Sequence, residues 1–304
     1  MSPPRLGIAR PTVHSPLRLG FTGTVLPHRG RWGDARPDGL ADAALPPHPV
    51  PAWSGGRPRH RWRYLGVYAE ELMLGVADVA IAGVLRQTFW SMWDVPTDRL
   101  LGRTSAWRHS VTRDGSRMLV HDGSVAIDVV VDEAAGVETI SRSGTQLAWT
   151  RKQAAIPAHV RLTLDGSTRE LDALACVDDS DGHHARHVAW RWSTGVGRLV
   201  GGAVVGWNLV AGIHDDPAAS ERTVWVDGEP HPVGPAVFAD DLTAVTIDGL
   251  VLRAALGPVR VANDNRLLVR SRYRQPYARF SGSLPGAGEL AAGWGVMEEH
   301  DVHW

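Results

Sequence analysis

The chain has 304 residues, of which 43% are apolar and 21% are charged, as in globular proteins rather than disordered or fibrous ones. Its formal net charge of −1, from 32 basic and 33 acidic residues, predicts no long-range attraction to nucleic acid or an anionic membrane. The single Cys176 excludes an intrachain disulfide and a multi-cysteine metal site.

The N-terminal sequence contains no apolar stretch of the kind that marks a secretory signal. The longest nearly apolar run, Leu72–Leu85, is interrupted by Asp78 and is shorter than the ~20 residues that a membrane-spanning helix needs. We therefore expect a soluble, cytoplasmic protein with no membrane span.

The first elements in chain order are short strands around an irregular segment. A strand is predicted over Arg18–Leu26, and residues 27–59 follow as a Pro- and Gly-rich wrapping loop or mobile flap. His60–Ala69 alternates cleanly between two faces, one of which carries Trp62 and Tyr64. These two aromatic side chains are our first candidates for ligand contacts.

The stretch Glu71–Asp94 contains the most informative pair of strands. Strand alternation places Asp78 in a row of apolar side chains, and Gly83 then separates a second, aromatic strand that includes Trp90. An aromatic sheet with one acid in its wall is suited to a pocket for an apolar or amphipathic small molecule. Trp90 is therefore a predicted ligand contact.

The rest of the chain reads as short strands separated by DG and SG turns. In the C-terminal half, His184–Thr194 carries Trp190 and Trp192 on one face, and Gly201–Ala211 carries Asn208 among small apolar residues. No segment has the apolar periodicity of an amphipathic helix. We predict an all-β protein of two antiparallel barrels or sandwiches, divided into residues 1–166 and 167–304.

Two places offer acid–base chemistry. Asp78 is a candidate proton donor because an apolar wall raises the pKa of a carboxyl, and it is equally a candidate for a structural ion pair with an arginine such as Arg103. On the last strand, Glu298 and His300 share a face with Trp294. Strand geometry places the Cα atoms of Glu298 and His300 ~7 Å apart. Both side chains could serve catalysis, or could satisfy neighbouring backbone and arginine groups.

Other motifs argue against cofactors. The segment DDSDGHHARH is rich in Asp and His, but its spacing fits neither an EF-hand nor a zincin, so we predict no metal. No GxSxG, GxxxxGK[ST] or GxGxxG sequence occurs, so neither a serine nucleophile nor a nucleotide cofactor is indicated.

Several stretches resemble a bacterial family, the domain-of-unknown-function family 2804. They are RWRYLGVY, DRLLGRTSAW, DDSDGHHARHVAWRWSTGVG, GWNLVAG, VWVDGE and GVMEEHDVHW. The resemblance extends from about Arg61 to the C-terminus, and its sheet pattern is similar to that of double lipocalin-like proteins of the carotenoid hydratase type. This likeness implies two lipocalin-like barrels with little helix, but it supplies no activity and no site residue.

Three functions follow from these observations. The first is a cofactor-independent hydratase, isomerase or cyclase that uses some of Asp78, Glu298 and His300. The second is a non-catalytic carrier or sensor for a lipid or isoprenoid-like compound. The third is a structural or interaction protein, because thirteen tryptophans can be explained by core packing alone.

Overall fold

A computed structural model describes residues 27–106, 109–266 and 269–304, so the strand predicted over Arg18–Leu26 lies outside the described residues. In the described part, the all-β prediction is confirmed: antiparallel strands are accompanied by a single 3-10 turn, η1 (Val95–Thr97), and by no α-helix. Within the same ranges, no helix is long and apolar enough to cross a membrane.

The first sheet contains eleven strands within the described ranges, in the order β7-β6-β5-β4-β13-β12-β10-β9-β8, with β11 paired to β12 and β1 to β11. We call this sheet and its attached loops the first half. Its strands are β1 (His28–Arg31), β4 (His60–Tyr68), β5 (Leu72–Ile81), β6 (Leu85–Asp94), β7 (Arg99–Ser105), β8 (Val111–Asp114), β9 (Arg117–Asp122), β10 (Val125–Val131), β11 (Val137–Ser143), β12 (Gln146–Leu164) and β13 (Ser167–Gly182).

The second sheet, which we call the second half, contains nine strands in the described ranges, in the order β17-β16-β15-β14-β22-β21-β20-β19-β18. A small separate hairpin joins β2 (Trp53–Ser54) to β3 (Arg57–Pro58). The strands of the second half are β14 (His187–Leu199), β15 (Val204–Ala211), β16 (Thr223–Val226), β17 (Glu229–Pro232), β18 (Ala236–Phe238), β19 (Ala244–Ile247), β20 (Leu250–Arg266), β21 (Val269–Leu284) and β22 (Gly288–His303).

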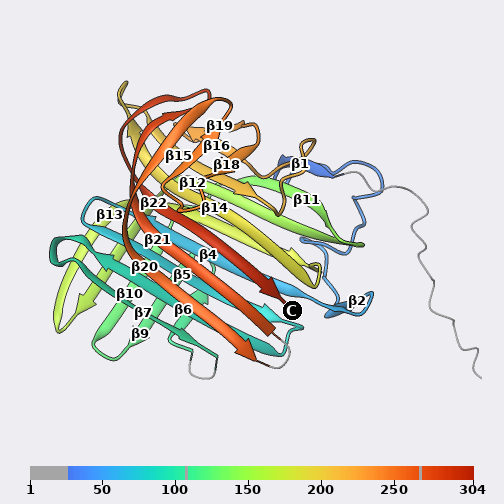
Figure 1. Cartoon of the computed structure of the whole chain (residues 1–304). Coiled ribbons are helices and arrows are strands. Elements are labelled where there is room, and N and C mark those ends of the chain that lie inside the picture. Colours follow the sequence, from blue (N-terminus) through green and yellow to red (C-terminus); the bar gives the residue numbers. More distant parts are fainter. Residues whose placement is uncertain (1–26, 107–108, 267–268) are drawn as a thin grey trace, which may run out of the picture.

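Each sheet curls around an apolar core of its own. In the first half, β8 approaches β5 and β6, and side chains such as Leu74, Val120 and Val160 fill the interior. In the second half, β18 approaches β15 around Trp207 and Phe280. Along each strand, residues that point into this core alternate with residues that point away from it, because successive side chains face opposite sides of a sheet. Each half therefore has a second face outside its own core. The two barrel-like halves lie against one another (Figure 1).

Residues 27–59 form an ordered wrap on the first half. β1 pairs with β11, and the turns that follow bury Leu40, Ala43 and Leu45 against Ile140 and Trp149. Of the two predictions for this segment, the structure therefore shows the wrapping loop.

The boundary between the halves differs from the one predicted at residue 166. β13 pairs with both β12 and β4, so it completes the first sheet, which ends at Gly182. The acidic segment after Val177 is the end of this strand. Asp165-Gly166 does form a hairpin turn, but this turn joins β12 and β13 of one sheet rather than the two halves.

Candidate functional site

The two halves meet along a surface that we call the seam, where one face of β4, β5 and β13 packs against β14, β15, β21 and β22. Its buried apolar side chains include Tyr64, Tyr68, Met73, Cys176, Trp192, Val196, Val210, Tyr277 and Val296. Figure 1 shows the long strands β20–β22 beside β4–β6, and β22 contacts β4 directly. Non-local pairing of this kind brings together residues that are more than two hundred positions apart.

Glu298 lies on the seam face of β22 and is only 6% exposed. Three neutral donors hold its carboxyl group: Trp190 Nε1 at 2.8 Å from Oε1, and Tyr273 Oη and Gln275 Nε2 each at 2.9 Å from Oε2. Burial raises the pKa of the Glu298 carboxyl above its ordinary value, although the bonds from Trp190 and Tyr273 act in the opposite direction. The side chain can therefore hold or release a proton at a higher pH than a free glutamic acid.

His300 stands beside Glu298 on the same face. Its Nε2 atom lies 2.8 Å from the Ser271 hydroxyl, and its ring packs edge-on against Trp190 and Tyr273, the same residues that donate to Glu298. Burial, and then the charge of Arg260, lowers the pKa of His300 to about 4, so the imidazole is neutral near pH 7. Glu298 and His300 thus form one acid–imidazole unit with shared aromatic neighbours.

The outer rim of this unit is aromatic and partly exposed. The guanidinium carbon of Arg260 lies 3.8 Å from the centroid of Phe89 and 4.7 Å from that of Tyr273. Phe89 belongs to the first half and Tyr273 to the second, so Arg260 bridges the two across the seam. Phe89, Trp190 and His300 are half-buried, and this is the side from which a molecule would reach Glu298.

Deeper in the seam, Lys152 is buried between two carboxylates. Its ammonium group pairs with Asp178 and with Glu221, and it is the only lysine in the sequence. Burial alone would lower the pKa of Lys152, but the charges of Asp178 and Glu221 raise it above its ordinary value. Asn208 accepts a bond from Trp192 Nε1 and donates to the Glu221 carbonyl, which ties the same network to the aromatic core.

A cluster of buried histidines continues the seam toward the C-terminus. His184 stacks on Trp62 and lies next to both His60 and His214, and His60 stacks on Trp304. Burial lowers the pKa of His60 to about 4 and that of His214 to about 3, and it lowers that of His184 strongly. These rings are neutral near pH 7 and form part of the packing.

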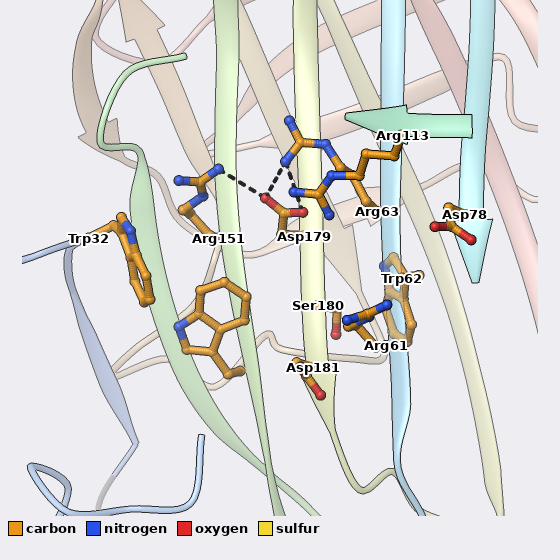
Figure 2. A pocket seen from close by; sticks show the side chains of 11 residues that line it. Trp32, Arg61, Trp62, Arg63, Asp78, Arg113, Arg151, Asp179, Ser180 and Asp181 are labelled. Carbon is orange, nitrogen blue, oxygen red and sulfur yellow. Dashed lines mark hydrogen bonds and ion pairs between the residues drawn. The ribbon is translucent and has the colours of Figure 1, made fainter. Parts of the chain in front are cut away.

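Asp78 lies elsewhere, beside a cavity of about 260 Å³ at one end of the interior of the first half. Figure 2 shows it on β5, apart from the central Asp179 and its arginine partners. The Asp78 carboxylate pairs with Arg86 at 2.7 Å, which is the structural ion pair that the sequence left open, with Arg86 in place of Arg103. Trp90 also points into the first half and donates to Asp122.

Comparison with known proteins identifies the family. Residues 102–304 match the family described as "Domain of unknown function (DUF2804)". The chain belongs to this family. No curated protein sequence matches the chain.

Several solved structures are similar to this DUF2804 chain. Kievitone hydratase from Nectria haematococca has 12% identity and a TM-score of 0.51 over 79% of this chain and 88% of its own. The AttH protein from Nitrosomonas europaea has 11% identity and a TM-score of 0.48 over 79% of this chain and 92% of its own. CghA has 11% identity and a TM-score of 0.43 over 81% and 88%. The predicted similarity to double lipocalin-like proteins is confirmed, as a likeness of fold.

The structure of this DUF2804 chain divides the predicted site residues into two groups. Those placed together on the seam face are Trp62, Tyr64, Trp190, Trp192, Asn208, Trp294, Glu298 and His300. Asp78 and Trp90 lie on the opposite, inward face of the first sheet. Alternation separates the two faces of a strand, but it does not tell which face meets the other half.

Sequence reasoning missed Tyr273, Gln275 and Arg260, which complete the surroundings of Glu298. A signal was present for the first two, because they alternate with Arg272 and Arg274 on a predicted strand.

One group of residues in the described ranges has the geometry of a metal site. Ligand atoms of His187, Asp301 and His303 lie within 4.8 Å of one another at the end of β14 and β22. The three side chains are between 45% and 56% exposed, and the Asp301 carboxylate already pairs with His187 at 2.8 Å. Asp301 and His303 lie on the face of β22 that points away from the seam, so this group is not part of the Glu298 site.

Proposed function

We propose that this protein binds an apolar or amphipathic small molecule at the partly exposed end of the seam, and that Glu298 exchanges a proton with it. The observation that carries this proposal is a buried carboxyl with a raised pKa, held by Trp190, Tyr273 and Gln275 behind an aromatic rim. A buried acid next to an aromatic surface is the arrangement that proton transfer to an apolar substrate requires.

The chemistry follows from the donors around Glu298. The protonated carboxyl gives its proton to a carbon of an electron-rich double bond, and a cation forms at the neighbouring carbon. Water then adds to that cation and returns one proton to the Glu298 carboxylate, which balances a hydration. Loss of a different carbon-bound proton to the carboxylate gives an isomerisation. Attack by an internal double bond moves the positive charge to another carbon, and loss of a proton from that cation to the carboxylate completes a cyclisation.

The residues around Glu298 have separate roles in this scheme. Trp190, Tyr273 and Gln275 stabilise the carboxylate after it has lost its proton, as preorganised donors do in a site of low polarity. The ring of Trp190 faces the substrate and stabilises a developing cation. Neutral His300, held by Ser271, orients water or a substrate hydroxyl. The step transfers only protons, so it calls for no cofactor.

The shared fold gives additional support. Kievitone hydratase, as its name says, hydrates kievitone, and the two folds match with a TM-score of 0.51 over most of both chains. The likeness concerns the fold, so the reaction is transferred here as part of the proposal only.

The test measures proton transfer to carbon. The purified chain is incubated in D2O with kievitone and with a panel of amphipathic compounds that carry an alkene, and deuterium in the recovered compounds is followed by mass spectrometry. We expect deuterium at one alkene carbon of at least one compound. Glu298→Gln should reduce the rate by about a hundredfold or more, because general acid catalysis contributes ~10²–10⁴.

The Gln variant is designed to fold. Gln keeps the shape of Glu298, and the buried Oε1 atom of Gln275 has no hydrogen-bond partner among the described residues. A rotated Gln275 amide can therefore accept a bond from the new side chain. The neutral fluorescent probe N-phenyl-1-naphthylamine reports binding, and its affinity should be unchanged by Glu298→Gln but reduced by Trp190→Ala. Probe binding without deuterium in any compound would favour the non-catalytic carrier.

A further inference from the structure

The cavity in the first half has a composition different from that of the seam. It has a volume of about 260 Å³ and opens between Trp32 and Trp149 on one side and Arg61 and Trp62 on the other. Figure 2 shows Asp179 at its centre between Arg63 and Arg151. A cavity of ~150 Å³ holds benzene, so this space can hold one aromatic ring with a short substituent.

Four acids at the cavity are already neutralised by four arginines. Asp78 pairs with Arg86, and Asp181 pairs with Arg59. Asp179 and Glu133 are shared between Arg63 and Arg151, which both of them contact. These pairs account for the buried charge of the wall.

Two further arginines line the cavity without a matching acid. Among the described side chains, no carboxylate lies within ion-pair distance of Arg61 or Arg113, and Arg113 Nε donates only to the Gly115 carbonyl. Burial, and then the charge of Arg63, lowers the pKa of Arg113, as expected where cations are in excess. The cavity therefore carries about two positive charges more than its acids compensate.

The wall also contains buried polar atoms without partners. The Ser180 hydroxyl and the Nε–H of Arg63 make no hydrogen bond to any described residue, and both residues are at least 98% buried. Groups of this kind are costly unless something pairs with them. On the opposite side, Trp32 and Trp149 form an edge-to-face pair with centroids 5.0 Å apart.

We propose that this cavity is a second binding site, for a small aromatic carboxylate. Guanidinium groups bind carboxylates with paired hydrogen bonds, and the carboxylate would supply the negative charge that Arg61 and Arg113 lack. The indoles of Trp32 and Trp149 would hold the ring. The inference is independent of the proposed function, because neither Glu298 nor any of its three hydrogen-bond donors lines the cavity.

Isothermal titration with phenylacetate tests the proposal. We expect saturable binding of one molecule per chain, and neutral phenylacetamide should bind at least about tenfold more weakly. Arg113→Ala and Arg61→Ala should each weaken phenylacetate binding by about tenfold, since each removes a charged donor. Neither side chain neutralises an acid, so these variants should retain the wild-type melting temperature.

Arg198→Ala is the matched control, because it removes an exposed arginine from the second half and should leave the phenylacetate affinity unchanged. Absence of saturable phenylacetate binding would overturn the proposal. So would equal affinities in the Arg61, Arg113 and Arg198 variants. Cyclohexylacetate or inorganic phosphate binding as tightly as phenylacetate would show that the indoles select no ring, which also contradicts it.

Discussion

Two carboxylates that look alike in the sequence, Asp78 and Glu298, have opposite surroundings in the structure. Each sits in a row of apolar side chains on a strand. Asp78 is neutralised by Arg86, whereas the donors to Glu298 are an indole, a phenol and an amide, none of them charged. Where the donors to a buried carboxyl are neutral, burial disfavours its charged form and raises its pKa. Glu298 is therefore the acid with adjustable protonation.

Lys152 offers a test of how the seam tolerates charge. Lys152→Met should lower the free energy of unfolding by about 3–5 kcal/mol, because it leaves the buried carboxylates of Asp178 and Glu221 without their cation. Urea denaturation measures the change. Arg117→Met is the control, because it breaks an exposed pair with Asp128 and should have little effect. Equal losses in both variants would mean that the buried network is not what stabilises the seam.

For individual residues, the sequence predicts which side chains share a strand face, and the structure shows which residues of other strands they contact. Alternation along the last strand is enough to place Glu298 and His300 together with Trp294. The donors to Glu298 come from β14 and β21, and their identity depends on the register of those strands against β22, which no local pattern encodes. For the same reason, the inward orientation of Asp78 and Trp90 could not be predicted.

Among the elements, β12 shows most clearly how local pattern and tertiary structure differ. The sequence predicts two strands, Thr145–Arg151 and Ala158–Leu164, because alternation fails over the residues between them. The structure has one continuous strand with a β-bulge between Gln153 and Ile156, where Ala155 adopts a positive φ of 56°. The bulge turns Ala154 toward the seam while Ile156 stays in the core of the first half.

Gly206 on β15 packs directly on this bulge. A Cβ atom at position 206 would lie 2.7 Å from Ala154 Cβ and 2.8 Å from the Ala155 nitrogen, so one of the two halves would have to shift. Gly206→Ala should therefore lower the free energy of unfolding by about 1–3 kcal/mol, the usual cost of overpacking. Thermal or urea denaturation checks it.

Gly201 provides the matched control, since a Cβ there would meet no heavy atom within 4 Å. Gly201→Ala should be neutral. If Gly206→Ala were equally neutral, the close contact between β12 and β15 would not be needed to hold the halves together.

For the whole molecule, two barrel-like halves of antiparallel strands were predictable from hairpin spacing alone. The division between them was not, because β13 begins with a hairpin turn and yet belongs to the first sheet. The seam itself is formed by faces that the sequence marks as apolar, without showing their partners. The same limit applies to function. Glu298 can be picked out in the sequence as a candidate acid, but the surroundings that raise its pKa form only in the complete fold.

The ionisation of Glu298 in the intact chain tests the central claim most directly. The protein is labelled with ¹³C at glutamate Cδ, and Glu298→Gln assigns the resonance by its loss. The account predicts a titration midpoint above the ordinary value of 4.5, because burial in the seam disfavours the charged form. Proton-donating activity should accordingly fall as pH rises through that midpoint. A midpoint at or below 4.5 would contradict the assignment of Glu298 as the acid of the site.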